Sequence, residues 1–397
     1  MKHKCLTCFK EFRVEQVHYR CNNRQCDEID EKLSAHMNKT TQIRGRVIEP
    51  ESKKGWPKGT SQQRCPNPQC QKETYIRLCP NCHDQLPTAL DGVQSLTVSV
   101  LGPRGSGKSL YLISTIEHLE KHVFPKCLGT SFEKSTQHTK EKYQTMRDRV
   151  YQSGRLLRPN DHAELDPEIL IPFVFHTRVK SYRSGFYPIQ RKNRINIVTF
   201  DVAGEACQKA DLLQTNCPNL PKHEALIIII DPTYFLKDQL PNEAKTSMVK
   251  DAEDPIVVIT NIQQYIKSAN NLGDKKITIP TAFVITKLDA LKQMHGFSNY
   301  NSILETDKHK NGYNATYCKE VSSQLKTFLE GLGASNVVKM AHDHFGNYLF
   351  FGVTSLGMPP TEINGQIRAD NLSPRNTESP WLWILHQKKL LLEVNGI

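Results

Sequence analysis

The octapeptide at residues 102–109 reads Gly102-Pro103-Arg104-Gly105-Ser106-Gly107-Lys108-Ser109 and matches G-x-x-x-x-G-K-S, the pattern of a phosphate-binding loop. An apolar stretch, 95–101, leads into it with the character of a buried strand, and 110–116 leaves it with the character of a helix. The glycines let the backbone wrap around a phosphate, and the loop N–H groups and the helix N-terminus supply donors and a positive dipole. We therefore expect Lys108 to reach the outer phosphates of a nucleotide and the Ser109 hydroxyl to ligate Mg²⁺.

Length and charge limit what the rest of the chain does. Its 397 residues leave room for two or three domains. It carries 52 Lys and Arg against 41 Asp and Glu, a net charge of +11, which favours anionic partners such as nucleic acid, acidic proteins or a membrane surface. A basic surface without a specific partner is an equal alternative.

The sequence predicts a cytoplasmic chain. No apolar run reaches the roughly 18–20 residues of a transmembrane helix, and the N-terminus lacks the apolar core of a signal peptide. In a reducing compartment cysteines are metal ligands or free thiols rather than disulfides.

Eight of the twelve cysteines come before residue 83, in four pairs: Cys5 and Cys8, Cys21 and Cys26, Cys65 and Cys70, Cys79 and Cys82. Paired thiolates at C-x2-C and C-x4-C spacing point two sulfurs at one ion, so eight ligands predict two closed, structural four-cysteine zinc sites. Such sites supply folding energy that a small apolar core cannot. We favour neighbouring pairs sharing an ion, because each ribbon then closes locally. The alternative is nesting, in which the first pair meets the last.

The cysteine-rich head, residues 1–90, is therefore expected to hold tandem zinc ribbons. The similar turns 20–26 and 64–70 suggest two related modules. Between them, Trp56 lies among lysines and is a candidate for stacking on a base, or for packing back on a ribbon. His83 is expected at the surface beside its cysteine turn. The remaining cysteines show no ligand spacing and are expected to be ordinary buried or free thiols: Cys127, Cys207, Cys217 and Cys318.

Residues 95–397 are expected to form a P-loop domain with an insertion at about 123–168. In nucleotide switches this position holds the segment that senses the γ-phosphate, and Thr130, Thr136 and Thr139 are candidates for a threonine that completes the magnesium shell. A strand at 169–179 is expected at a sheet edge because of Pro172. The next strand, 194–201, ends in Asp201-Val202-Ala203-Gly204-Glu205, which fits D-x-x-G. Asp201 is placed to hold Mg²⁺, and the Gly204 N–H to meet a γ-phosphate.

Three further strands complete the predicted sheet. The strand at 225–230 is apolar throughout, as in a parallel sheet covered on both faces, and a helix at 254–271 follows. The strand at 279–285 ends in Thr286-Lys287-Leu288-Asp289, which fits the [N/T]-K-x-D motif of guanine recognition. Asp289 can accept from both guanine N–H groups, while the Lys287 stem lies over the base. After the strand at 348–353, the loop N–H at Ser355 is expected to contact guanine O6. A helix capped by Ser379 closes the chain.

These motifs, in this order and at strand ends, resemble the Ras-like, translation-factor-related class of P-loop GTPases. The fold implied is α/β, a P-loop NTPase sheet flanked by helices and preceded by a small zinc-ribbon region. With its zinc-ribbon head and long insertion, the chain is more particularly similar to the bacterial double-GTPase families, which are thought to occur in conflict or defence modules. The resemblance implies a switch that binds GTP or GDP with Mg²⁺ and hydrolyses GTP, together with a protein partner or activator that the head docks or senses.

The chain departs from the class at two positions near the phosphates. Ras-like members usually have Gln after D-x-x-G to orient the attacking water, whereas this chain has Glu205. A carboxylate there either positions water or repels the γ-phosphate. Many small GTPases have Gly where this chain has Arg104, which can act as an arginine finger in cis, block a partner's finger or point to solvent. The expected catalytic residues are thus Lys108, Arg104 and Glu205.

Two other functions compete with a GTPase. In an ATPase, Asp231 after the strand 225–230 would be the Walker B acid, although Pro232 follows where a second acid is usual. In a non-hydrolysing module the bound nucleotide would be structural and the ribbons would do the work. Nucleic-acid binding through the basic head is compatible with the GTPase interpretation.

Overall fold

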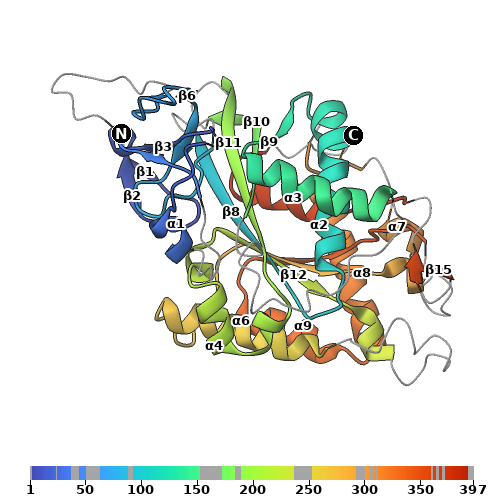
Figure 1. Cartoon of the computed structure of the whole chain (residues 1–397). Coiled ribbons are helices and arrows are strands. Elements are labelled where there is room, and N and C mark those ends of the chain that lie inside the picture. Colours follow the sequence, from blue (N-terminus) through green and yellow to red (C-terminus); the bar gives the residue numbers. More distant parts are fainter. Residues whose placement is uncertain are drawn as a thin grey trace.

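Seven strands form the central sheet of the computed structural model, in the order β14-β13-β12-β8-β11-β10-β9 (Figure 1). Strands β14 to β11 in this order are parallel, and β10 and β9 are antiparallel additions. The strands are β8 (Gln94–Leu101), β9 (Phe132–Lys134), β10 (Phe173–Arg183), β11 (Ile189–Asp201), β12 (Ala225–Ile230), β13 (Thr281–Ile285) and β14 (Tyr348–Gly352). The structure describes residues 2–23, 25–36, 44–50, 63–87, 93–152, 172–183, 189–236, 253–291, 300–304, 308–309, 312–358, 361–363, 366–368 and 372–391.

Helices flank this sheet and bury its apolar faces (Figure 1). They are α2 (Lys108–His118), α3 (Gln137–Arg147), α4 (Ala210–Asn216), α6 (Pro255–Ala269), α7 (Tyr300–Ile303), α8 (Ala315–Gly331), α9 (Ser335–His344) and α10 (Ser379–Gln387). Shorter 3-10 turns and two π-helical segments lie at Glu205–Gln208, Leu220–Lys222, Pro232–Leu236, Leu288–Leu291, Leu119–Cys127 and Asp148–Gln152. Strands β15 (Thr361–Ile363) and β16 (Gln366–Arg368) pair with each other and form a separate two-stranded sheet.

The expected order of strands and helices is confirmed, with differences at the edges. All six residues of β12 are fully buried, as the unbroken apolar run indicated. The strand after Pro172 is not the edge of the sheet, because β9 pairs with it from inside the inserted segment. Helix α10 begins at Ser379 itself, and Glu378 takes the N-cap position. The described helices include none that is long and apolar enough to cross a membrane.

The cysteine-rich head forms several small sheets rather than two consecutive ribbons. Strand β3 (His18–Arg20) lies between β4 (Val47–Ile48) and β7 (Ile76–Leu78), so the beginning and end of the head share one sheet. The remaining elements are the hairpins β1 (Lys2–Lys4) with β2 (Glu11–Arg13) and β5 (Gln63–Arg64) with β6 (Glu73–Thr74), the 3-10 turn Val14–Gln16, and α1 (Glu31–His36).

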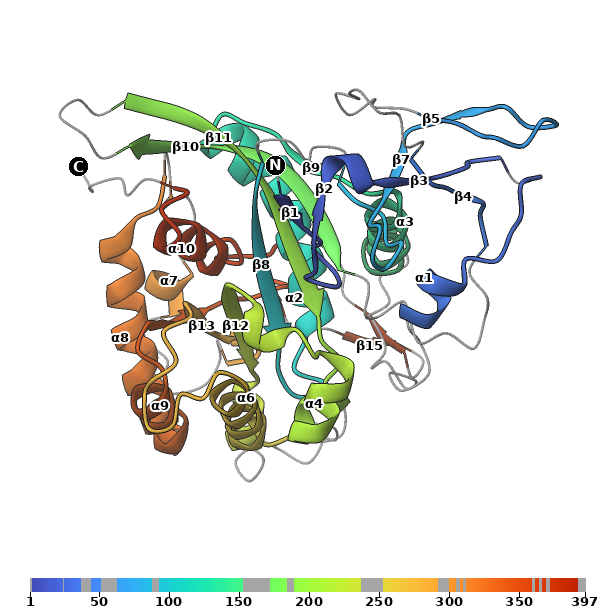
Figure 2. The ribbon, with the colours of Figure 1, turned by 90° about the vertical axis from the view of Figure 1, so that its left-hand side faces the viewer.

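The first cysteine turn of the head packs against the P-loop domain. Leu6 lies in a buried cluster with Val174 of β10 and Val198 of β11. Phe9 stacks on His223 at a ring-centroid distance of 5.2 Å, and the Asn219 side chain donates to the backbone of the same turn at 3.2 Å. Burial lowers the pKa of His223 to about 3, so the ring is neutral at pH 7 and suits an apolar contact. Figure 2 shows the head, in blue, to one side of the central sheet.

Candidate nucleotide-binding site and cysteine clusters

The loop 102–109 joins β8 to α2, as its flanks predicted. Gly102 has φ +154°, and a Cβ there would lie 2.8 Å from the Ile229 carbonyl oxygen, so the position has no room for a side chain. Gly107 precedes α2 in the left-handed region, φ +86°. The Lys108 ammonium donates to the carbonyls of Gly102 at 2.9 Å and Pro103 at 2.6 Å, which holds it over the mouth of the loop.

Ser109, in the first turn of α2, meets Asp201 at the carboxyl end of β11. The Ser109 hydroxyl donates to Asp201 Oδ2 at 2.8 Å, because β11 pairs in parallel with β8 and places Asp201 opposite Val100. A hydroxyl at a helix N-terminus and a carboxylate at the adjoining strand end are hard oxygen ligands of the kind that Mg²⁺ takes from proteins, so these residues fit the ion.

Asp231, the metal ligand expected under the ATPase alternative, contacts Lys287 and Thr233 instead of Ser109. Its carboxylate accepts from Lys287 Nζ at 2.6 Å and from the Thr233 hydroxyl at 2.7 Å, at the end of β12. Of the two aspartates considered for the metal, the geometry favours Asp201, which weakens the ATPase alternative.

Gly204 packs directly on the P-loop. A Cβ at this position would lie 2.5 Å from the Arg104 nitrogen and 2.6 Å from its Cα. These are backbone atoms, which cannot move aside as a flexible side chain does. The D-x-x-G loop therefore closes onto the P-loop only because residue 204 has no side chain.

Replacing Gly204 by alanine is expected to separate the two loops. We expect affinity for a non-hydrolysable GTP analogue to fall at least about tenfold, or about 1.4 kcal/mol, while GDP affinity changes less, because the lost contact faces the γ-phosphate side. Fluorescence titration with both nucleotides measures this. Gly331→Ala is the matched control, because a Cβ there meets nothing within 4 Å. Equal losses for the two nucleotides would contradict the prediction.

Two carboxylates converge on Arg104. Glu205 Oε1 lies 3.3 Å from its side-chain Nε as an ion pair. Glu253 accepts from the Arg104 backbone N–H at 2.8 Å and also from the Gln208 side-chain amide. Arg104 and Glu205, the two residues at which the chain departs from the Ras-like pattern, therefore form an ion pair with each other. Sequence reasoning missed Gln208 and Glu253, because neither lies in a motif and 149 positions separate Glu253 from its P-loop contact.

The predicted guanine-recognition residues lie at adjoining strand ends. The Thr286 hydroxyl donates to the Ser106 carbonyl at 2.9 Å and so ties this motif to the P-loop. Asp289 is 5% exposed and accepts from the Thr354 hydroxyl at 2.5 Å. Burial raises the pKa of Asp289, which the Thr354 hydrogen bond partly opposes. Ser355 follows in the same loop, and Lys287, at φ +54°, is held by Asp231.

The inserted segment gives two of its candidate threonines structural roles. Thr136 caps α3, accepting from the Thr139 N–H at 3.1 Å. The Thr139 hydroxyl in turn accepts from the Val174 N–H at 2.9 Å, and both threonines are buried. Thr130 donates its backbone N–H to the Phe124 carbonyl at 2.9 Å. The rest of the insertion lies within residues 153–171, which are outside the described residues, as is Trp56 in the head.

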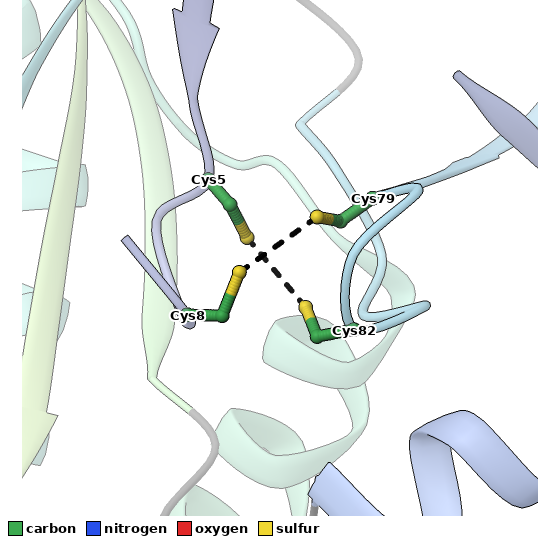
Figure 3. Close-up of side chains that lie close together, drawn as sticks. All are labelled: Cys5, Cys8, Cys79 and Cys82. Carbon is green, nitrogen blue, oxygen red and sulfur yellow. Dashed lines mark hydrogen bonds between the residues drawn. The ribbon is translucent and has the colours of Figure 1, made fainter. Parts of the chain in front are cut away.

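The eight head cysteines form two clusters that are nested, not sequential. One cluster holds Cys5, Cys8, Cys79 and Cys82 (Figure 3), and the other holds Cys21, Cys26, Cys65 and Cys70. The favoured pairing of neighbours is therefore wrong, and the alternative is confirmed. The physical reason is that β3 pairs with both β4 and β7, which brings the two ends of the head together.

The sulfur spacing in both clusters fits a zinc ion. Four sulfurs at 2.3 Å around a tetrahedral ion lie about 3.8 Å apart. The Sγ–Sγ distances are 3.7 Å for Cys5–Cys82 and 3.9 Å for Cys8–Cys79 in one cluster. In the other they are 3.7 Å for Cys21–Cys70 and 3.8 Å for Cys26–Cys65.

We call the cluster of Cys21, Cys26, Cys65 and Cys70 the inner cluster and the other the outer cluster. In the inner cluster, an asparagine from each cysteine turn donates to a sulfur of the opposite turn. Asn23 Nδ2 donates to Cys70 at 3.1 Å, and Asn67 Nδ2 donates to Cys26 at 3.4 Å. The Asn23 hydrogen bond lowers the pKa of Cys70 to about 6, which favours the thiolate. The two similar turns noted in the sequence therefore face each other across one metal site instead of marking two modules.

His83 is buried rather than exposed, which corrects the expectation for this residue. Its Nδ1 lies 2.8 Å from Asp30 Oδ1 and its Nε2 lies 3.2 Å from His18 Nδ1. Asp30 also accepts from Arg20 at 2.6 Å. A histidine directly after a cysteine turn is thus part of the small core of the head. Cys207, Cys217 and Cys318 are buried thiols, and Cys127 is half-buried.

Comparison with known proteins finds distant similarities. No family model matches the chain. It is 22% identical over 326 residues to the putative ESX-1 scaffolding and assembly protein SaeC of Mycolicibacterium smegmatis, covering 78% of this chain and 79% of that one.

Among solved structures, the chain is similar to the Arl6 small GTPase of Trypanosoma brucei with a bound nucleotide analogue. The sequence identity is 13%, the match covers 74% of this chain and 97% of that one, and the TM-score is 0.30. It is also similar to the GTP-bound Ski7 GTPase-like domain of S. cerevisiae. The sequence identity is 16%, the match covers 77% of this chain and 51% of that one, and the TM-score is 0.31.

The order of the strands and the loops at their ends define the class of protein. The fold is that of the P-loop GTPases, with two four-cysteine clusters of the zinc-ribbon type at the N-terminal side. Within that class the arrangement is the Ras-like one, in which the antiparallel strand β10 pairs with the strand that carries D-x-x-G.

Proposed function

We propose that this chain is a switch that binds GTP with Mg²⁺ and hydrolyses it to GDP and phosphate. The observation that carries the proposal is the buried carboxylate of Asp289, joined to the P-loop through Thr286 and Ser106. A buried acid at this strand end recognises guanine because it accepts from two adjacent N–H groups that adenine does not present. Nucleotide selectivity, compared between the wild type and an Asp289 variant, tests the proposal.

Hydrolysis would use groups that the fold already holds in place. Water attacks the γ-phosphate in line, and charge develops on the phosphate oxygens. Lys108 and the loop N–H groups stabilise that charge, and Mg²⁺ on Ser109 and Asp201 supplies further neutralisation. Gly204, packed on the P-loop, would offer its N–H to the γ-phosphate.

Arg104 is proposed to act as an arginine finger in cis. Its ion pair with Glu205 holds the guanidinium at the P-loop, and a phosphate of higher charge competes with Glu205 for it. The pairing also offsets the repulsion that Glu205 alone would exert on the γ-phosphate. Gln208, held by Glu253, is the candidate for orienting water in place of the usual glutamine.

Replacing Arg104 by glutamine is expected to slow single-turnover GTP hydrolysis about 10²-fold or more, with GDP affinity within about threefold of wild type, because arginine fingers contribute mainly in the transition state. Rapid-quench measurement with protein in excess gives the rate. Arg149→Gln, at an exposed arginine after α3, is the control. A wild-type rate in Arg104→Gln would show that this residue has no part in the chemistry.

We further propose that the nucleotide state controls the assembly of a protein complex through the head. The similarity to a mycobacterial protein described as a scaffolding and assembly factor supports this over a role in defence, which rests on the family resemblance alone. The two closed thiolate clusters suit a reducing compartment such as the cytoplasm. Cross-linking in the native cells, with wild type compared to Asp289→Asn, tests it: a partner recovered equally with both contradicts nucleotide control.

A further inference from the structure

The turn at residues 5–9 carries two ligands of the outer cluster and joins the head to the P-loop domain. Leu6 lies in one buried cluster with Val174 and Val198, which are paired across β10 and β11. The Thr7 carbonyl accepts from the Asn219 side chain at 3.2 Å. Figure 2 shows β1 and β2, which flank this turn, beside β8 and β11. The outer cluster therefore lies next to the two strands that lead into the P-loop and into D-x-x-G.

His223 connects this turn to the end of those two strands. Its ring stacks on Phe9 at a centroid distance of 5.2 Å and on Phe200 at 4.6 Å. Its Nδ1 is hydrogen-bonded to the Ser99 hydroxyl. Ser99 of β8 and Phe200 of β11 are register partners, and Asp201 follows Phe200 directly. His223 thus contacts both strands one position before the aspartate that fits Mg²⁺.

The shape of the turn depends on the outer cluster. Phe9 directly follows the ligand Cys8 and has φ +59°, a left-handed conformation that is unfavourable for a residue other than glycine. Its N–H donates to the Cys5 carbonyl at 3.2 Å, so the turn closes over its two ligands. The Thr7 hydroxyl donates to Asp84, just after the other two ligands. Because metal binding supplies folding energy to such sites, loss of the outer zinc should release Phe9 from its place on the P-loop domain.

The inner cluster lies away from the P-loop domain. Among the residues that the structure describes, the hydrogen bonds of Asn23 and Asn67 to the inner sulfurs stay within the head. Strand β5, next to Cys65, lies at the end of the head that is remote from the central sheet (Figure 2). One chain therefore holds two metal sites of the same composition, and the described contacts with the P-loop domain belong to the outer one.

We propose that zinc at the outer cluster and the nucleotide at the P-loop stabilise each other, so that loading of the outer cluster tightens nucleotide binding. The proposal rests on the proposed function and adds a regulation to the same site. A nucleotide that engages Asp201 orders the end of β11, and Phe200 then keeps the His223 ring in place for Phe9. The coupling acts in both directions, because the effect of one ligand on the affinity of another is reciprocal.

The experiment measures the occupancy of each cluster separately in the full chain. The protein is equilibrated at a series of free zinc concentrations, set by a buffer that does not bind Mg²⁺, with and without saturating GDP and Mg²⁺. A pulse of N-ethylmaleimide then alkylates the thiols that hold no metal, and mass spectrometry of peptides identifies them. We expect GDP to lower the zinc concentration for half-occupancy of the outer cluster at least about fivefold, and that of the inner cluster less than about twofold. GDP affinity should fall by the same factor in protein that has lost only the outer zinc.

Replacing Phe9 by alanine removes the contact and should abolish the effect of GDP on the outer cluster. Tyr75→Ala is the matched control, because this aromatic ring of the head is 60% exposed, and it should leave the effect unchanged. Occupancy of the inner cluster in the same sample shows whether the head of the Phe9 variant has folded. His223→Leu removes the stack from the side of the P-loop domain and is the second test if Phe9→Ala alone prevents zinc binding at the outer cluster.

An equal effect of GDP on both clusters overturns the proposal. So does the absence of any effect, or an effect that persists in both Phe9→Ala and His223→Leu. The same titration with ADP separates this inference from the proposed function, because coupling to ADP alone supports the inference and contradicts guanine recognition. A chain that binds neither nucleotide overturns both.

Discussion

Replacing Cys8 and Cys79 together by serine should leave one zinc ion per chain, whereas replacing Cys8 and Cys26 together should leave none. The first pair lies in one cluster and the second pair is split between the two clusters. Neighbouring ribbons would give the opposite result, because Cys8 and Cys26 would then share an ion. The two double variants remove the same number of thiols, so each is the control for the other.

Zinc is measured by mass spectrometry of metals in protein purified without oxygen, with two ions expected in wild type and in Cys318→Ser, a buried thiol of α8. Structural zinc supplies on the order of 10 kcal/mol of apparent binding free energy, so the cluster that loses a ligand should lose its ion. If a double variant is insoluble, mild oxidation of metal-stripped wild type gives a second readout. The cross-linked peptides should join Cys8 with Cys79, whose sulfurs lie 3.9 Å apart.

Replacing Asp289 by asparagine should abolish the preference for guanine nucleotides. The wild-type carboxylate can accept two N–H hydrogen bonds from guanine, each worth about 1.5 kcal/mol or more when the acceptor is charged and buried. Losing both corresponds to a decrease in GDP affinity on the order of 10²-fold. The measurement is binding of fluorescent GDP and ADP in Mg²⁺ to both proteins, with ADP affinity expected to stay low and unchanged.

A control separates recognition from folding at this site. The Asp289 side chain also accepts from Thr354, so the asparagine, which keeps an oxygen acceptor, preserves that contact. Thr354→Val removes the contact from the other side and should reduce GDP affinity less than the Asp289 variant does. Equal binding of GDP and ADP by wild type would contradict the guanine assignment and revive the ATPase alternative with Asp231.

The sequence could place the residues of the candidate nucleotide site because each of its motifs is local. A P-loop, D-x-x-G and T-K-x-D each follow a buried strand, and parallel strands bring their carboxyl ends to one edge of a sheet. Ser109 and Asp201 thus meet at 2.8 Å although 92 positions separate them. Fold class and candidate residues followed from these rules.

What the sequence could not predict depends on long-range pairing. The nested clusters require β3 to pair with β7, and nothing in the spacing of Cys21 or Cys79 specifies that. The buried position of His83 follows from the same pairing. Glu253 contacts the P-loop from just before α6, and β9 covers β10 from within an insertion whose strand is only three residues long.

The nested clusters also impose an order on biosynthesis. Cys5 and Cys8 leave the ribosome first, yet their metal partners are Cys79 and Cys82, so the outer cluster cannot close until the whole head has been translated. His223, on which Phe9 stacks, follows Cys82 by about 140 residues, which at 5–20 residues per second takes roughly 7 to 28 s. During that interval the nascent head has all eight cysteines of its two clusters, but Phe9 does not yet have the ring on which it stacks. The two clusters can therefore close before the surface of the P-loop domain on which the head packs has been translated.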